Sequence, residues 1–99
     1  MNFSEKLAAI LVDGKWGYLN ESGHTVIEPQ FDQAQMFREG LAAVRLGTKW
    51  GFIDREGRWV ISPRLEGFTI GFKNGLARIE GPEQGYINKA GAYVWRDTN

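Results

Sequence analysis

Few side chains in this sequence could perform acid–base, nucleophilic or metal chemistry. The chain has 99 residues, no cysteine and one histidine, His24. A zinc site or a Cys–His nucleophile needs more such side chains, so neither is expected. Asp54 could act as a general acid or base, but the residues 34 positions before and after it are Asn20 and Asn88, which cannot exchange a proton in that way. We therefore expect no catalytic residue, no metal and no cofactor.

The side chains that suit binding are aromatic. The chain contains six Phe, four Trp and three Tyr, and such rings bury large apolar areas in cores and interfaces. Trp16 and Trp50 recur at a fixed spacing, which favours a role in packing one unit on the next. Trp59 and Trp95 follow turns where the first unit has Thr25, so the repeat does not require an aromatic there. Side chains that depart from a repeat are the better candidates for a binding site.

These residues belong to a sequence that repeats about every 34 positions. Lys15-Trp16-Gly17-Tyr18 returns as Lys49-Trp50-Gly51-Phe52, and Gly85-Tyr86-Ile87-Asn88 begins a third copy. Leu41-Ala42-Ala43-Val44 returns 35 positions later as Leu76-Ala77-Arg78-Ile79, so the second unit carries one extra residue. Internal repeats of this length are typical of arrays that stack small units. We expect one domain over residues 1–99, in units of roughly 3–36, 37–71 and 72–99.

Each unit is expected to contain three short strands. In the second unit these are Leu41 to Leu46, Trp50 to Asp54 and Arg58 to Ser62. Asp13-Gly14 predicts a two-residue hairpin turn, and Asn20 begins a second type of turn that a glycine closes. Pro29 and Pro63 are expected to end the third strands, because proline removes a ladder donor. The return segment, Phe31 to Glu39 in the first unit, fits either a helical turn or a strand.

The expected fold is all-β. The strand and turn pattern predicts tandem antiparallel β-hairpin repeats that form an open solenoid-like or a partly curled sheet. The twelve Lys and Arg balance the twelve Asp and Glu. Binding to nucleic acid or to an anionic membrane depends on positive charge, so neither partner is expected. The sequence shows neither a signal-peptide pattern nor an apolar stretch long enough to span a membrane, so a cytoplasmic location is expected.

The repeated residues resemble the WG-repeat family of bacterial β-hairpin proteins, which is named for its Trp-Gly pair. The family pattern joins Lys-Trp-Gly-Tyr/Phe-Ile-Asp to Val-Ile-x-Pro, Phe-Asp-x-Ala and Phe-x-Glu-Gly-Leu-Ala. The first unit matches it almost throughout from Lys15 to Ala42, the second departs after Pro63, and the third has Gln84 in place of the Trp. The resemblance implies a scaffold for protein–protein contact and, for a small array, an immunity protein encoded beside a bacterial toxin gene.

The expected function is a non-enzymatic protein-binding module, in its sharpest form an immunity or inhibitor protein that covers a bacterial toxin. The expected contacts lie where the second unit departs from the first: Trp59, Arg58, Arg45, Leu65, Phe68 and Ile70. An alternative is a carbohydrate or cell-wall binder, which would need Trp16 and Trp50 partly exposed between hairpins. A further alternative is a structural fragment that self-associates through its sheet edges.

Overall fold

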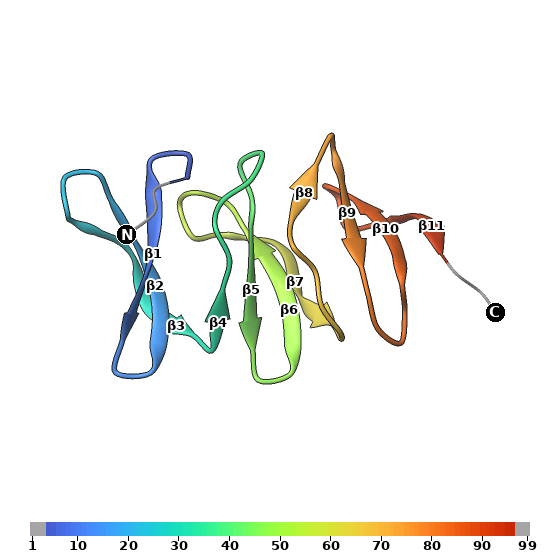
Figure 1. Cartoon of the computed structure of the whole chain (residues 1–99), viewed down its shortest axis with the longest axis horizontal. Coiled ribbons are helices and arrows are strands. Elements are labelled where there is room, and N and C mark those ends of the chain that lie inside the picture. The colour runs from blue at the N-terminus through green and yellow to red at the C-terminus, as the bar shows by residue number, and fades with distance from the viewer. Residues whose placement is uncertain (1–3, 97–99) are drawn as a thin grey trace.

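The chain folds into three antiparallel sheets that lie side by side. A computed structural model describes residues 4–96. These residues form strands and no α-helix, so the all-β prediction is confirmed, and none of them belongs to a helix that could cross a membrane. Figure 1 shows the three sheets following one another along the long axis of the molecule, which measures 46 Å against 26 and 20 Å. The tandem arrangement of hairpin repeats is likewise confirmed.

Each sheet contains one copy of the repeated hairpin and its flanking strands. The first sheet has the order β1-β2-β3, with β1 (Leu7–Val12), β2 (Lys15–Asn20) and β3 (Thr25–Phe31). The second has the order β4-β5-β6-β7, with β4 (Gln33–Ala34), β5 (Ala42–Leu46), β6 (Lys49–Ile53) and β7 (Trp59–Leu65). The third has the order β11-β10-β9-β8, with β8 (Phe72–Lys73), β9 (Leu76–Ile79), β10 (Gly85–Asn88) and β11 (Tyr93–Arg96).

The return segments join neighbouring sheets, and neither forms a helix. In the first, β4 pairs with β5 through Ala34 and Val44, although it follows the hairpins of the first unit in the chain. In the second, Phe68 bridges Glu80 of the third unit. In the same segment Gly71 has a φ of 105° just before β8. Each return segment thus completes the sheet of the next unit.

The turns follow the sequence prediction. Asp13 and Gly14 have φ values of 50° and 81° between the paired residues of β1 and β2, as a two-residue hairpin turn requires. In the other turn, the side-chain oxygen of Asn20, Asp54 or Asn88 accepts two backbone N–H groups at 2.9 to 3.1 Å. Asp54 therefore has the turn-forming role of its two asparagine counterparts.

The prediction that the prolines end the third strands is wrong. β3 continues through Pro29 and β7 through Pro63. In the first sheet the pairing passes from Tyr18–Ile27 to Trp16–Phe31, so three residues of β3 bulge opposite one residue of β2. Proline is tolerated at such a bulge, because the ladder is locally interrupted and its missing N–H is not needed.

The same bulge explains the glycine of the Trp-Gly pair. A Cβ atom on Gly51 would lie 2.6 Å from the carbonyl oxygen of Ile61 and 2.9 Å from the nitrogen of Pro63. A Cβ atom on Gly17 would lie 2.7 Å from the nitrogen of Pro29. Backbone atoms do not leave room for a side chain at these distances, so the bulge of the third strand requires glycine on the second.

Two hydrophobic clusters hold the three sheets together. The cluster between the first and second sheets contains Leu7, Tyr18, Ile27, Phe31, Phe37, Ala42, Val44 and Ile53. The cluster between the second and third contains Leu41, Ala43, Trp50, Phe52, Ile61, Leu65, Phe72, Ala77, Ile79 and Ile87. The second sheet therefore buries both faces, and β6 is buried along almost its whole length. β9 of the third sheet alternates between exposed and buried residues, because only one of its faces is covered.

Candidate functional site

The two boundaries between units have the same construction. At the first, the ring of Phe37 packs edge to face on Tyr18, with centroids 4.8 Å apart. At the second, Phe72 packs in the same way on Phe52, again at 4.8 Å. All four rings are fully buried. The aromatic residue that follows each Trp-Gly pair therefore receives a phenylalanine from the next unit.

We call the side of a unit that takes this phenylalanine its receiving face. In the second unit the face includes Leu41, Ala43, Phe52 and Ile61, all of which are in the second hydrophobic cluster. By the repeat and the strand pairing, the receiving face of the third unit is formed by Leu76, Arg78, Tyr86 and Trp95. No unit covers it among residues 4–96 (Figure 1).

Lack of a cover changes the exposure of equivalent residues. Leu41 is 7% exposed, whereas Leu76 is 38% exposed. Phe52 is completely buried, whereas Tyr86 is only half-buried. The residue type is the same or closely similar in each pair, so the difference arises from the missing neighbour and not from the strand itself.

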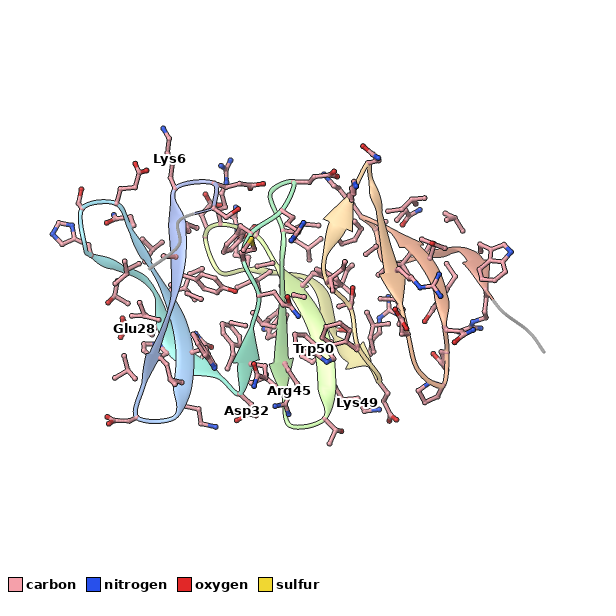
Figure 2. All side chains as sticks on the ribbon, viewed as in Figure 1. Lys6, Glu28, Asp32, Arg45, Lys49 and Trp50 are labelled. Atoms are coloured by element: carbon pink, nitrogen blue, oxygen red, sulfur yellow. The ribbon has the colours of Figure 1, made fainter. Side chains whose placement is uncertain are left out.

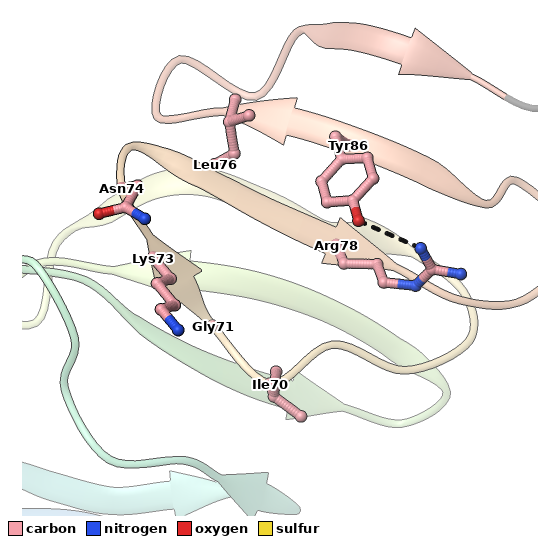
Figure 3. A pocket seen from close by; sticks show the side chains of 7 residues that line it. All are labelled: Ile70, Gly71, Lys73, Asn74, Leu76, Arg78 and Tyr86. Atoms are coloured by element: carbon pink, nitrogen blue, oxygen red, sulfur yellow. Dashed lines mark hydrogen bonds between the residues drawn. The ribbon is translucent and has the colours of Figure 1, made fainter.

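A groove with a volume of about 410 Å³ lies over this face (Figure 3). Its lining comes from the second return segment and from β8, β9 and β10: Ile70, Gly71, Lys73, Asn74, Leu76, Arg78 and Tyr86. The volume is in the range of ligand-binding clefts, and the lining combines apolar side chains with two cations. The groove lies on the receiving face of the third unit and is our candidate functional site.

Arg78 gives the third receiving face a charge that the other two lack. Its counterparts are Ala9 and Ala43, whose methyl groups leave room for the incoming phenylalanine. Nη1 of Arg78 donates to the Tyr86 hydroxyl at 3.2 Å, and the guanidinium carbon lies 5.6 Å from the centre of that ring (Figure 3). The hydrogen bond to Tyr86 raises the pKa of Arg78, and Glu80 lies 3.4 Å from its Nε atom. The groove thus carries a fixed positive charge beside an aromatic ring.

Phe68 and Ile70 are exposed apolar residues of the second return segment, and Ile70 lines the groove. They are 49% and 57% exposed. The ring of Phe68 packs edge to face on Trp50, with centroids 6.3 Å apart, and Trp50 is itself buried. Phe68 therefore has one supported side and one open side, which is the arrangement of an anchor residue at an interface.

The six residues predicted from the sequence do not form a single site. Leu65 is in the core between the second and third sheets and is 2% exposed, so its side chain does not reach the surface. Its counterpart Phe31 is equally buried in the other cluster. The change from Phe31 to Leu65 is therefore a change of core packing, and sequence comparison alone could not distinguish it from a change at the surface.

Trp59 and Arg58 lie at the other boundary. The ring of Trp59 is 41% exposed and packs edge to face on Phe31, with centroids 5.8 Å apart, so it belongs to the junction of the first two sheets. Arg58 forms ion pairs with Asp54 at 3.1 Å and Glu56 at 3.0 Å. Although burial raises the pKa of Asp54, the backbone and side-chain N–H groups of Arg58 and the backbone N–H of Glu56 donate to its carboxylate and keep that pKa below its ordinary value. Neither Trp59 nor Arg58 lines the groove at Ile70.

Arg45 is half-buried at the tip of the second hairpin. Its Nη1 atom donates to the carbonyl of Gly47 in the adjoining turn. Asp32 lies at the same end of the sheets (Figure 2), accepting the Gly47 N–H at 2.7 Å and the Lys15 ammonium at 2.6 Å. The hydrogen bond from Lys15 lowers the pKa of Asp32. These contacts connect the first and second sheets, so Arg45 adjoins a structural link.

The aromatic residues divide into packing and surface groups. Trp50 is 6% exposed and packs in the core, as its spacing predicted, whereas Trp16 is half-buried. The carbohydrate alternative needed both rings partly exposed, and only Trp16 meets that condition. The assignment of Trp95 to the position of Thr25 was wrong, because Trp95 pairs with Tyr86 as Ile61 pairs with Phe52.

Sequence reasoning missed most of the third receiving face. Trp95 is 55% exposed, and its ring packs 6.4 Å from that of Tyr86. A count of 34 positions from Ile61 would have placed Trp95 on this face, and the replacement of Ala43 by Arg78 was the second available signal. Among residues 4–96, no group of three or more His, Asp or Glu side chains is placed to hold a metal ion.

Comparison with known protein families agrees with this architecture. The WG containing repeat matches residues 1–16, 16–50 and 50–80. The boundaries of these matches fall at Trp16 and Trp50, which begin the Trp-Gly pairs of the first two units. No curated protein and no solved structure matches the chain. On the extent of the three matches, the chain belongs to the WG containing repeat family.

Proposed function

We propose that the chain is a non-enzymatic protein-binding module, and that it binds through the receiving face of the third unit together with Phe68 and Ile70. One observation carries this proposal: two equivalent faces in the same chain are filled by protein, and the third is open. The residue types required for packing, Leu76 and Tyr86, are present on the open face. A partner protein would bury them as Phe37 and Phe72 bury their counterparts.

The composition of the open face supports a protein partner. Protein interfaces are enriched in Trp, Tyr, Phe and Arg at their centres. On this face the exposed ring of Trp95 packs on Tyr86, with centroids 6.4 Å apart, and the guanidinium of Arg78 lies over the same Tyr86 ring. Aromatic rings already supported on one side lose little conformational freedom on binding, which favours affinity.

The identity of the partner and the location of the protein are inferred from the sequence alone. A bacterial toxin as the partner is suggested by the family resemblance alone. A cytoplasmic location, and partners other than nucleic acid or a membrane, are expectations from the balanced charge and from the pattern of the sequence. The carbohydrate alternative has weaker support, since Trp50 is buried.

Site-specific crosslinking tests the proposed function. A photoreactive phenylalanine analogue replaces Ile70, and in a matched control it replaces Val60, which is 43% exposed on β7. In cells of the source organism we expect one dominant protein crosslinked from position 70 and none from position 60. With that protein purified, Tyr86→Ala should weaken binding at least about tenfold by calorimetry. Equal crosslinking from both positions, or retention on cell-wall glycan without a protein partner, would contradict the proposal.

A further inference from the structure

We infer that the receiving face of the third unit binds the N-terminal end of a second copy of this chain, so that copies join head to tail. This inference rests on the proposed function, because it names the partner of the same face. Its basis is that the first unit presents the same elements that fill the two internal receiving faces. The second copy would extend the array across a chain boundary.

The first such element is a turn that is already formed. We call the two-residue turn before the first strand of each unit its leading turn. The Ser4 N–H donates to Leu7 O at 2.9 Å and the Leu7 N–H to Ser4 O at 3.1 Å, as Arg38 and Leu41 do in the second unit at 2.8 and 3.1 Å. The first unit therefore carries the leading turn in the shape that docks within the chain.

The backbone of the three leading turns is also alike. Glu5 and Lys6 have φ values of 55° and 68°, against 54° and 82° for Glu39 and Gly40. Lys6 thus adopts a left-handed conformation at a place where the second and third units have glycine. The shape of the turn is kept in the first unit despite a residue that disfavours it.

A carboxylate of the preceding unit holds each internal leading turn. The Gly40 N–H donates to Glu5 Oε1 at 2.8 Å, and the Gly75 N–H donates to Glu39 Oε1 at 2.8 Å. In the third unit Asn74 occupies the position of Glu39. The amide oxygen of Asn74 can accept the N–H of Lys6 from a second copy. The same hydrogen bond would form, with a neutral amide as the acceptor in place of a carboxylate.

The second element is an apolar surface that we call the inserting face, the side of a unit that meets the preceding receiving face. In the second and third units it consists of Ala42, Val44 and Ile53, and of Ala77, Ile79 and Ile87, all at most 1% exposed. In the first unit the equivalent residues are Ala8, Ile10 and Leu19, of which Ile10 and Leu19 are only half-buried. Docking on a second copy would bury them against Leu76 and Tyr86.

Charge favours the same orientation. The first unit, 3–36, contains five acidic and two basic side chains, whereas the third, 72–99, contains four basic and three acidic ones. Arg78 and Lys73 of the groove are among the basic residues. A head-to-tail contact brings the acidic unit of one copy to the basic unit of the next, and such complementarity selects the orientation of an interface.

Because the two surfaces differ, the contact is heterologous. Such contacts produce open chains or rings and not a closed two-fold dimer. A variant with a blocked receiving face should still bind through its inserting face. A variant with a blocked inserting face should still bind through its receiving face. This asymmetry provides the test.

The experiment measures the mass of the full-length chain by sedimentation velocity and light scattering. Leu76→Arg blocks the receiving face and Ile10→Lys blocks the inserting face. We expect the average mass of the wild type to rise with concentration above the 11.2 kDa of one chain. Each variant alone should stay at the mass of one chain. An equimolar mixture of the two should form a complex of twice that mass, since each supplies the face that the other lacks.

Three outcomes would overturn the inference: a wild type that stays monomeric, a blocked variant that still self-associates, or a mixture that yields no complex. Circular dichroism identifies any variant that fails to fold. Trp95→Glu, at a side chain that is 55% exposed, and Leu19→Lys then replace the first pair. The proposed function fails separately, because it predicts a crosslinked partner at position 70 whether or not that partner is a second copy.

Discussion

The second and third units contain equivalent strands, but among residues 4–96 only the second lies between two neighbouring units. Leu41 and Leu76 occupy the same place in the repeat and differ in exposure from 7% to 38%. β6 is buried on both faces, whereas β10 alternates between buried and half-buried residues. In a stacked array, the burial of a residue is therefore determined by the neighbouring unit as much as by its own type.

The largest test of this comparison removes the aromatic ring at equivalent positions of the second and third units. Phe52→Ala should destabilise the chain by about 3–5 kcal/mol, because it leaves a cavity between Leu41 and Phe72 in the core. Tyr86→Ala should cost about 1 kcal/mol, because its site is open to solvent on one side. Urea unfolding of both variants checks the difference. Equal losses would mean that the third unit is as well covered as the second.

The glycines that follow Trp50 and Gln84 at equivalent positions give a second comparison. Gly51→Ala should cost about 1–3 kcal/mol, since the new methyl group would meet Ile61 O at 2.6 Å and the Trp59 side chain at 2.8 Å. Gly85→Ala should cost less, because β11 is an edge strand whose outward residues are exposed and which can move away. Thermal unfolding of the two variants measures both effects. A larger loss for Gly85→Ala would show that β11 is held more firmly than its exposure indicates.

Amide exchange compares the same regions without a substitution. We expect the amides paired between β10 and β11 to exchange at least about tenfold faster than those paired between β6 and β7, a difference of about 1.4 kcal/mol in opening free energy. The reason is that β7 contributes Leu65 and Ile61 to the core, whereas β11 is largely exposed. Nuclear magnetic resonance exchange rates measured at low protein concentration provide the test. Uniform protection across the three sheets would contradict it.

The smallest expected effect concerns the Glu39 carboxylate. Its hydrogen bond from the Gly75 N–H is the main cause of a pKa below the ordinary value of 4.5, and contacts with Asn74 and Lys89 add to it. Because the folded state favours the ionised form, this stabilisation is complete above about pH 4.5 and is lost as the pH falls through the lowered pKa. Glu39→Gln should therefore reduce stability at neutral pH and flatten the loss of stability in acid.

The third unit supplies the control for this pH effect. Asn74 occupies the equivalent position and carries no titratable group. Asn74→Ala should leave the shape of the acid unfolding curve unchanged, as measured by melting temperature between pH 3 and 7 (roughly the range in which carboxylates titrate). If Glu39→Gln also leaves the curve unchanged, the leading turn of the third unit does not depend on that carboxylate.

The turns of the fold were predictable from the sequence. Which face of each sheet is buried by a neighbouring unit was not. Asp13-Gly14 and Asn20 fix their turns through backbone conformation and short hydrogen bonds, which depend on nearby residues only. Pro63 was misread because a bulge, which depends on pairing with β6, lets a strand continue past a proline. Leu65 was misread because its burial depends on the third unit, which lies beyond its own hairpin.

The candidate site was predicted only in part. Phe68 and Ile70 were recognisable as departures from the first unit, and the structure places both on the surface. Leu76 and Tyr86 follow the repeat, so nothing in their own type marks them as surface residues. Their exposure follows from the position of the third unit in the array, which requires the order and orientation of the sheets to be known.

The strand that crosses from each unit to the next sheet has a genetic consequence. Since β4 completes the sheet of the second unit, that sheet is one continuous segment of the chain, from Gln33 of β4 to Leu65 of β7. A duplication or deletion of one whole repeat, which is 34 codons or 35 where it includes the extra residue of the second unit, restores the same order of strands because the repeat is cyclic. Unequal recombination can therefore lengthen or shorten the array without leaving an unpaired strand in its interior.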